Sequence, residues 1–408
     1  MNKRSIYRLI AAVIALGLAA VTIELLAHVY LYARDGRYIS ARERLQALDN
    51  TFITGITRGE SGCSYVDTVY PHPYLAFVHH GNPPCGVPNI NNIGLFGPDY
   101  PSERPADRFV VLVTGGSVAA QMLQSGPAGA PYLQTILDRD YVSPTGQPFL
   151  VLNGGDGAWH QPQQLILFLL YADAVHAVVT LDGFNEHYML ESSSRFEYPA
   201  SNFHQLNPLA SQQFGDMVAR WMAGRLRATA ASNAVLSRSQ VAYSMVSAME
   251  TLAARRAASR PKPRTTIESI FALPAEWTPA QRKAWATGQY QKYLTSISLL
   301  AKHYGVLSAH FIQPAPAVAK PLTADERRVV GDLAYGPLYS EMAAALVDLT
   351  KQGTPTISLL QIFEGDTRTL YGDPVHLIRD TTGRSIGYER MADRMATELG
   401  TLWRLQKR

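Results

Sequence analysis

The residues best suited to chemistry are a serine, an asparagine and an Asp–His pair, each standing shortly after a short apolar run. They are Ser117, Asn185, Asp373 and His376. A serine hydroxyl becomes a useful nucleophile when a histidine removes its proton and a carboxylate fixes the tautomer of that histidine. The spacing Asp373-x-x-His376 allows this within one local turn. The pattern predicts nucleophilic acyl chemistry with Ser117 as nucleophile, His376 as base and Asp373 as orienting acid.

Such chemistry also needs donors for the oxyanion of the tetrahedral intermediate. The candidates are the backbone amide of Ser117, an amide of Gly157 or Ala158 in a glycine-rich turn, and the side chain of Asn185. Trp159 and His187 stand beside these residues in the chain and are candidates for walls of a substrate site. Taken alone, Ser117 is better explained as the N-cap of an ordinary strand–helix unit, and only the motifs elsewhere in the chain reverse that preference.

Two further sets of polar residues have simpler interpretations. Asp182 and Glu186 flank Asn185, and we expect them to hold that loop by hydrogen bonds. His72, His79 and His80 lack obvious acidic partners at metal-ligand spacing, and His160 has only Asp156 nearby in the sequence, so we expect all four histidines to be solvated or packed.

Five apolar runs of strand length must position the reactive residues. Helix-compatible segments separate the runs, which is typical of a mainly parallel α/β sheet covered by helices on both faces. The turns after such strands lie along one edge of the sheet, where ligands bind. The expected strands are at about 109–114, 149–152, 177–181, 308–312 and 356–360.

The connection between the third and fourth runs is too long for one crossover helix. Residues from about 190 to 280 hold two amphipathic stretches, Gln213 to Ala231 and Ser239 to Arg256, followed by a basic, proline-bearing loop. We interpret this segment as a helical insertion. It is consistent either with a lid over the carboxyl edge of the sheet or with a docking surface for an envelope protein partner.

The N-terminus has the features of a membrane anchor. Residues 1–8 are basic, and the apolar stretch 9–33 is long enough to cross a bilayer and lacks a small-x-small cleavage site. We predict an uncleaved helix with a cytoplasmic N-terminus and the remaining chain in the periplasm or outside the cell, with a cleaved signal peptide as the alternative. Glu24 lies near the outer interface or pairs inside a larger complex.

The rest of the 408-residue chain divides into a stalk and irregular lead-in at 34–104 and an α/β domain at 105–408. Cys63 and Cys85 are the only cysteines, and a disulfide between them suits an oxidising compartment, with two free thiols as the alternative. They lack nearby ligands at zinc-type spacing, so no metal site is expected. The formal charge of +4 is mild and scattered, which argues against nucleic-acid binding.

In order and spacing these motifs resemble the SGNH (GDSL-like) hydrolase family. Residues 115–119 stand where that family has its Gly-Asp-Ser block, with Gly116 in place of the acid. Residues 183–186 match the Gly-x-Asn-Asp block with Glu186 as the last residue, and residues 373–376 match the Asp-x-x-His block.

The resemblance covers about residues 90–405 and includes two further motifs. The oxyanion glycine of the family falls on Ala158, and a backbone N–H from alanine serves if its φ and ψ are allowed. Asn91-Asn92-Ile93-Gly94 looks like the lead-in of envelope members. The resemblance implies a three-layer, flavodoxin-like fold.

The resemblance implies a serine esterase that needs no cofactor. Together with the predicted anchor, it gives a membrane-anchored extracytoplasmic enzyme. Its expected substrate is an O-acyl ester, such as an acetyl group on an envelope glycan or lipid. Two alternatives stay open. One is an O-acyltransferase that uses the same triad, and the other is a non-catalytic envelope assembly protein with a degenerate site. Gly116 and Ala158 depart from the family pattern and favour the last alternative, whereas the four intact residues oppose it.

Overall fold

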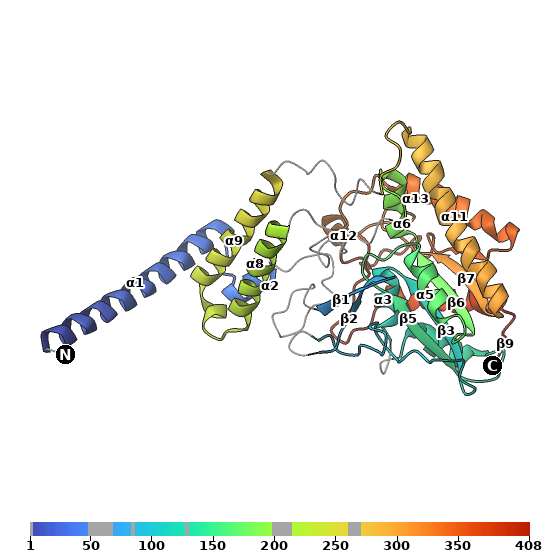
Figure 1. Cartoon of the computed structure of the whole chain (residues 1–408), viewed down its shortest axis with the longest axis horizontal. Coiled ribbons are helices and arrows are strands. Elements are labelled where there is room, and N and C mark those ends of the chain that lie inside the picture. The colour runs from blue at the N-terminus through green and yellow to red at the C-terminus, as the bar shows by residue number, and fades with distance from the viewer. Residues whose placement is uncertain (1–2, 48–67, 83–85, 127–129, 198–213, 260–270) are drawn as a thin grey trace. The chain divides into compact units, whose positions relative to one another are not determined.

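The computed structural model describes residues 3–47, 68–82, 86–126, 130–197, 214–259 and 271–408 (Figure 1). The chain forms two compact units, here called the helical unit and the sheet unit. The helical unit comprises Met1–Val69, Gly81–Val87 and Pro208–Arg264. The sheet unit comprises Tyr70–His80, Pro88–Asn207 and Thr265–Arg408.

A five-stranded sheet forms the centre of the sheet unit, with the strand order β5-β3-β6-β7-β8 (Figure 1). Each neighbouring pair is parallel. Counted along the sheet, the strands run in the order 2-1-3-4-5, which is the flavodoxin-like doubly wound arrangement. The predicted parallel α/β sheet is therefore confirmed. Its strands are β3 (Phe109–Gly115), β5 (Phe149–Gly155), β6 (Ala177–Asp182), β7 (Leu307–Ile312) and β8 (Thr356–Ser358).

The central strands form where the sequence is apolar without alternation. Every residue of β3 and of β6 is buried. β-Branched side chains suit this position, since a central parallel strand is covered on both faces. The glycines that end β3 and β5 let the backbone of a neighbouring segment approach closely. A Cβ at Gly115 would lie 2.1 Å from the carbonyl oxygen of Leu181.

Two groups of helices cover the sheet and give three layers. One group packs on β3 and β5: α3 (Ser117–Leu123), α4 (Tyr132–Asp140) and, against these helices, α14 (Ile386–Leu402). The other group packs on the sheet and on itself: α5 (Gln163–Tyr171), α6 (Phe184–Glu191), α11 (Pro279–Tyr304) and α13 (Gly336–Val347). The shorter elements are β1 (Val69–His72), β2 (Ala76–His79), β4 (Tyr141–Val142), α12 (Ala324–Val329) and β9 (Gln406–Lys407).

The helical unit contains the N-terminal helix and both helices of the insertion. Its described helices are α1 (Lys3–Asp35), α2 (Ala41–Ala47), α8 (Phe214–Ser232) and α9 (Gln240–Ser259). Within the predicted insertion of about 190–280, α8 and α9 form a helical hairpin that packs on α1 and α2. The lid and the partner-docking surface predicted for it both remain predictions.

Among the described residues, one helix is long and apolar enough to cross a membrane, at Arg4–Asp35. A membrane anchor and a signal sequence both have this property. Cys63 and Cys85 lie outside the described residues, so the disulfide stays a prediction.

Candidate active site

The end of β3 places Ser117 at the carboxyl edge of the sheet. The strand stops at Gly115, and α3 begins at Ser117. Gly116 between them packs tightly, because a Cβ there would lie 2.4 Å from Nδ2 of Asn185. Glycine at this position therefore lets the amide of Asn185 sit against the backbone beside the serine. This close contact gives a physical reason for glycine at position 116, where the Gly-Asp-Ser block has an acid.

His376 lies between Ser117 and Asp373. Its Nε2 is 2.7 Å from Oγ of Ser117, and its Nδ1 is 2.7 Å from Oδ2 of Asp373. A carboxylate only accepts, so Nδ1 carries the proton and Nε2 is left to accept the proton of the serine. The three predicted residues are thus brought into one hydrogen-bonded line. His376 is 7% exposed, and Ser117 is half-buried.

The loop itself fixes Asp373. Its second carboxylate oxygen accepts the amides of Val375 at 2.9 Å and His376 at 2.7 Å. Burial by itself would raise the pKa of Asp373, but the hydrogen bonds from His376 and from these amides outweigh it and lower the pKa. The carboxylate therefore stays ionised and oriented at neutral pH.

Asn185 is on the first turn of α6, on the other side of the serine. Its Nδ2 donates to the carbonyl oxygen of Trp159 at 2.7 Å, which fixes the direction of the amide. Since Nδ2 has two hydrogens, one remains to face a ligand. The turn before α6 depends on Gly183, whose φ of 118° favours glycine.

The turn after β5 holds the two candidate amide donors, and the structure distinguishes them. The amide of Gly157 already donates to Oδ1 of Asp156 at 2.6 Å. The amide of Ala158 makes no hydrogen bond to another described residue. Ala158 has φ 58°, in the left-handed region that suits glycine better. Ala158 is thus the better placed of the two candidate donors.

A buried hydrogen bond between side chains supports this turn. Nε2 of His79 on β2 lies 3.1 Å from Oδ1 of Asp156, and both side chains are 0% exposed. His79 was expected to be solvated or packed, and its contact with Asp156 was missed because 77 positions separate the partners. No sequence pattern signalled it.

Asp182 and Glu186 hold the Asn185 turn through a buried network. Glu186 accepts the amide of Gly183 at 2.8 Å and the amide of Gln161 at 3.1 Å. Asp182 accepts from the hydroxyl of Tyr290 and from the side chain of Gln161. Burial raises the pKa of both carboxyl groups, and their mutual repulsion adds to the effect at Glu186. They hold the loop, as expected.

The two candidate wall residues are both buried. Trp159 is 0% exposed and packs edge-on against Phe77. His187 is 2% exposed, and its ring stacks on Tyr335 at 4.8 Å. Burial lowers the pKa of His187 to about 4. Neither ring presents an open face to solvent, and their contact with a substrate stays a prediction.

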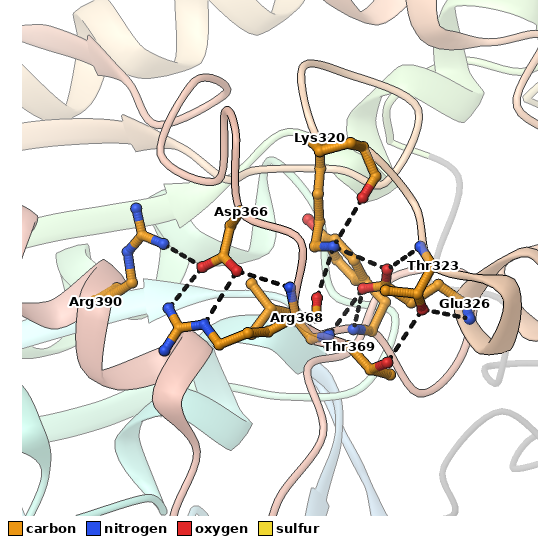
Figure 2. Close-up of polar contacts among 10 residues, drawn as sticks. Lys320, Thr323, Glu326, Asp366, Arg368, Thr369 and Arg390 are labelled. Atoms are coloured by element: carbon orange, nitrogen blue, oxygen red, sulfur yellow. Dashed lines mark hydrogen bonds and ion pairs between the residues drawn. The ribbon is translucent and has the colours of Figure 1, made fainter.

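A buried ion pair between Lys320 and Glu326 supports the loop that bears Asp373 and His376 (Figure 2). Nζ of Lys320 is 2.8 Å from Oε2 of Glu326 and donates to the carbonyl oxygen of Arg368 at 2.9 Å. The other oxygen of Glu326 accepts the amides of Leu370 and Tyr371 at 2.8 and 3.0 Å. The pair thus anchors the chain just before Asp373.

Only the local contacts of Glu326 have a recognisable sequence pattern. Thr323-x-x-Glu326 has the pattern of a capping box, and α12 begins with one. The contacts with Leu370 and Tyr371 lie more than 40 positions away and have no signature. Within the described ranges, no cluster of three or more histidine, cysteine, aspartate or glutamate side chains is arranged to hold a metal ion.

No family model matches this chain, and no curated protein matches it. Solved structures with distant similarity include a candidate acylhydrolase from Bacteroides fragilis, with 10% identity over 74% of this chain and 91% of that one and a TM-score of 0.37. They also include a GDSL-like lipase from Bacteroides thetaiotaomicron, with 11% identity over 72% and 89% of the chains and a TM-score of 0.33. At this similarity, the function of the chain has to be argued from its own residues.

Proposed function

We propose that the protein is a membrane-anchored, extracytoplasmic serine esterase of the SGNH type that acts on O-acyl groups of an envelope glycan or lipid. The observation that carries this proposal is the hydrogen-bonded line from Ser117 through His376 to Asp373, with 2.7 Å at each step. A decayed site in a scaffold protein would have no need of this geometry.

In the proposed first step, His376 takes the proton of Ser117 while the serine oxygen attacks the ester carbonyl carbon. The oxyanion accepts hydrogen bonds from the amides of Ser117 and Ala158 and from Nδ2 of Asn185. His376 then gives its proton to the leaving alcohol oxygen, and an acyl-serine remains. In the second step, His376 takes a proton from water while the water oxygen attacks the acyl carbon. His376 then returns that proton to Oγ of Ser117 as the bond from Oγ to the acyl carbon breaks and the acid is released.

The anchor part of the proposal is supported by the structure of the helical unit. Leu31 on α1 belongs to a small apolar cluster with Leu45, Tyr243 and Val246 from α2 and α9. Cleavage after the apolar stretch would remove α1 from this cluster. These contacts therefore support an uncleaved anchor rather than a cleaved signal peptide.

The proposal is tested by hydrolysis of an aryl acetate with the full chain in detergent. Wild type should turn over, and Ser117→Ala and His376→Ala should each lower kcat by about 10⁴-fold or more, as loss of a triad member does. A rate unaffected by Ser117→Ala would contradict the proposal. Adding sugar acceptors then distinguishes release to water from transfer to a hydroxyl group.

A further inference from the structure

The carboxylate of Glu24, inside the apolar stretch of α1, is bound by the start of α9. Its oxygens accept the hydroxyl of Ser239 at 2.7 Å and the amide of Gln240 at 2.6 Å, with the amide of Val241 at 3.4 Å. The first amides of a helix have no partner within the helix, and its positive end favours a carboxylate. The partner of Glu24 therefore lies within the same chain, so no larger complex is needed to satisfy it.

This contact fixes the depth of the α8–α9 hairpin along α1. Glu24 is 16 residues beyond Arg8, or about 24 Å at 1.5 Å per residue, and a bilayer core is about 30 Å thick. The apolar cluster of Leu31, Tyr243 and Val246 follows Glu24 and Gln240 in the same direction along both helices. α9 thus runs alongside α1 toward the outer surface, with the tip of the hairpin as its deepest point.

The surface of the hairpin suits lipid. At the tip, Val235 is 75% exposed and Leu236 is 39% exposed. Further along α9, Met245 and Met249 are also exposed. Several large apolar side chains exposed on one small hairpin indicate a contact surface, because monomeric soluble proteins rarely expose large apolar patches.

The charges on the hairpin agree with a position at a lipid surface. Between Asp216 and Glu250 the sequence contains four arginines and no acidic residue: Arg220, Arg225, Arg227 and Arg238. Basic side chains near an interface extend to the headgroups and are attracted by anionic lipids. Arg238 lies in the tip beside the exposed Val235 and Leu236, and the other three arginines lie on α8. Basic residues next to exposed apolar ones are typical of an element that lies in the outer part of a bilayer.

We propose that the α8–α9 hairpin inserts its tip, residues 233–239, into the outer leaflet beside α1, with the carboxylate of Glu24 hydrogen-bonded to the start of α9. The inference rests on the anchor in the proposed function. It assigns the insertion a lipid contact, and it explains how an acidic residue is tolerated in the apolar stretch of the anchor.

The test uses the full chain in phosphatidylcholine–phosphatidylglycerol vesicles, with a small fluorescent amino acid placed at one position. A nitroxide on the lipid chains should remove most of the fluorescence of a label at Val235. A label at Leu16 on α1 serves as the membrane control, and a label at exposed Thr145 of the sheet unit serves as the aqueous control.

The outcomes separate the inference from the anchor. A label at Val235 that aqueous iodide quenches, with Leu16 quenched from the lipid, overturns the hairpin contact and leaves the anchor intact. A Val235 label protected from both quenchers means that protein covers the tip, which also overturns the lipid assignment. A Leu16 label out of reach of the lipid quencher overturns the anchor and the hairpin contact together.

A pair of variants tests the role of Glu24. Glu24→Ala should remove most of the lipid quenching at Val235, because the cap that ties α9 to α1 is lost. Glu43→Ala on α2, another acidic residue of the helical unit, should leave the quenching unchanged. Equal quenching in both variants would overturn the claim that Glu24 sets the depth of the hairpin.

Discussion

The two sides of the candidate site are each held by a buried glutamate, but the two glutamates are stabilised differently. On the base side, Glu326 anchors the chain before Asp373 and has Lys320 as counter-charge. On the oxyanion side, Glu186 anchors the Asn185 turn with amide donors alone and lies close to a second buried acid, Asp182. Lys320 thus balances the charge of Glu326 on the base side. On the oxyanion side, the contacts described for Glu186 include no cation.

This difference sets opposite pKa shifts. Burial by itself would raise the pKa of Glu326, but the hydrogen bonds from Lys320 and from backbone amides outweigh it and lower the pKa to about 2. Burial and repulsion by Asp182 raise the pKa of Glu186. Stability from Glu326 is therefore lost as the pH falls from about 4.5 toward 2, whereas stability from Glu186 is lost as the pH rises above about 4.5. The lesson is that similar anchoring contacts make the two sides sensitive to opposite pH changes.

The largest expected effect comes from removing the counter-charge on the base side. Lys320→Met should lower the free energy of unfolding by about 3 kcal/mol or more, because it leaves the charge of Glu326 buried and unpaired. The double variant Lys320→Met/Glu326→Gln should recover a large part of that loss. Urea unfolding of the three proteins measures both effects, and a loss in Lys320→Met below about 1 kcal/mol would contradict the account.

Next in size is the loss of the side-chain donor on the oxyanion side. Asn185→Ala should lower kcat for an aryl acetate by about 100-fold or more, as removal of an oxyanion donor does. Circular dichroism should show an intact fold, since the one hydrogen bond that Nδ2 makes to the described part of the chain is to Trp159. Unchanged turnover would remove Asn185 from the proposed site.

The pH dependence of stability separates the two glutamates directly. From pH 5 to 8, these carboxyl groups are ionised in the unfolded chain, whereas the folded Glu186–Asp182 pair retains a proton. The free energy of unfolding of wild type should therefore fall as the pH rises, by about 1.4 kcal/mol for each unit by which the pKa is raised. Glu186→Gln should flatten this decline, and Glu326→Gln should leave it in place. Denaturant unfolding across the pH series provides the measurement. An equally steep decline in Glu186→Gln would refute the assignment.

The smallest effect tests the strained position in the oxyanion turn. Ala158→Gly should stabilise the protein by about 0.5–1 kcal/mol, because glycine adopts a positive φ without the Cβ penalty. Turnover should be nearly unchanged, since the donor is a backbone N–H. Ala319→Gly is the matched control, with φ 62° at an exposed position. If Ala158→Gly abolished turnover while Ala319→Gly did not, the methyl group itself would be required at the site.

The fold and the base side of the site were predictable because their signals are local. Continuous apolar runs identified all five strands, and the Asp373-x-x-His376 spacing brings acid and base together within one turn. The support that Asp182 and Glu186 give to the Asn185 turn was also predicted, but supporting contacts between residues far apart in the sequence were not predictable. The pairs His79–Asp156 and Glu24–Gln240 join residues 77 and 216 positions apart. Periodicity shows which face of an element is buried, but it does not identify the distant residue that packs against it.

The most direct test of the central claim is covalent labelling of the full chain with a fluorophosphonate, followed by intact-mass and peptide analysis. An activated serine attacks phosphorus, and the leaving group departs, so wild type should gain one adduct on the peptide that contains Ser117. His376→Ala should label slowly, and Ser117→Ala should not label at all. A folded wild type that gains no adduct, or a Ser117→Ala variant that labels as wild type does, would contradict the account.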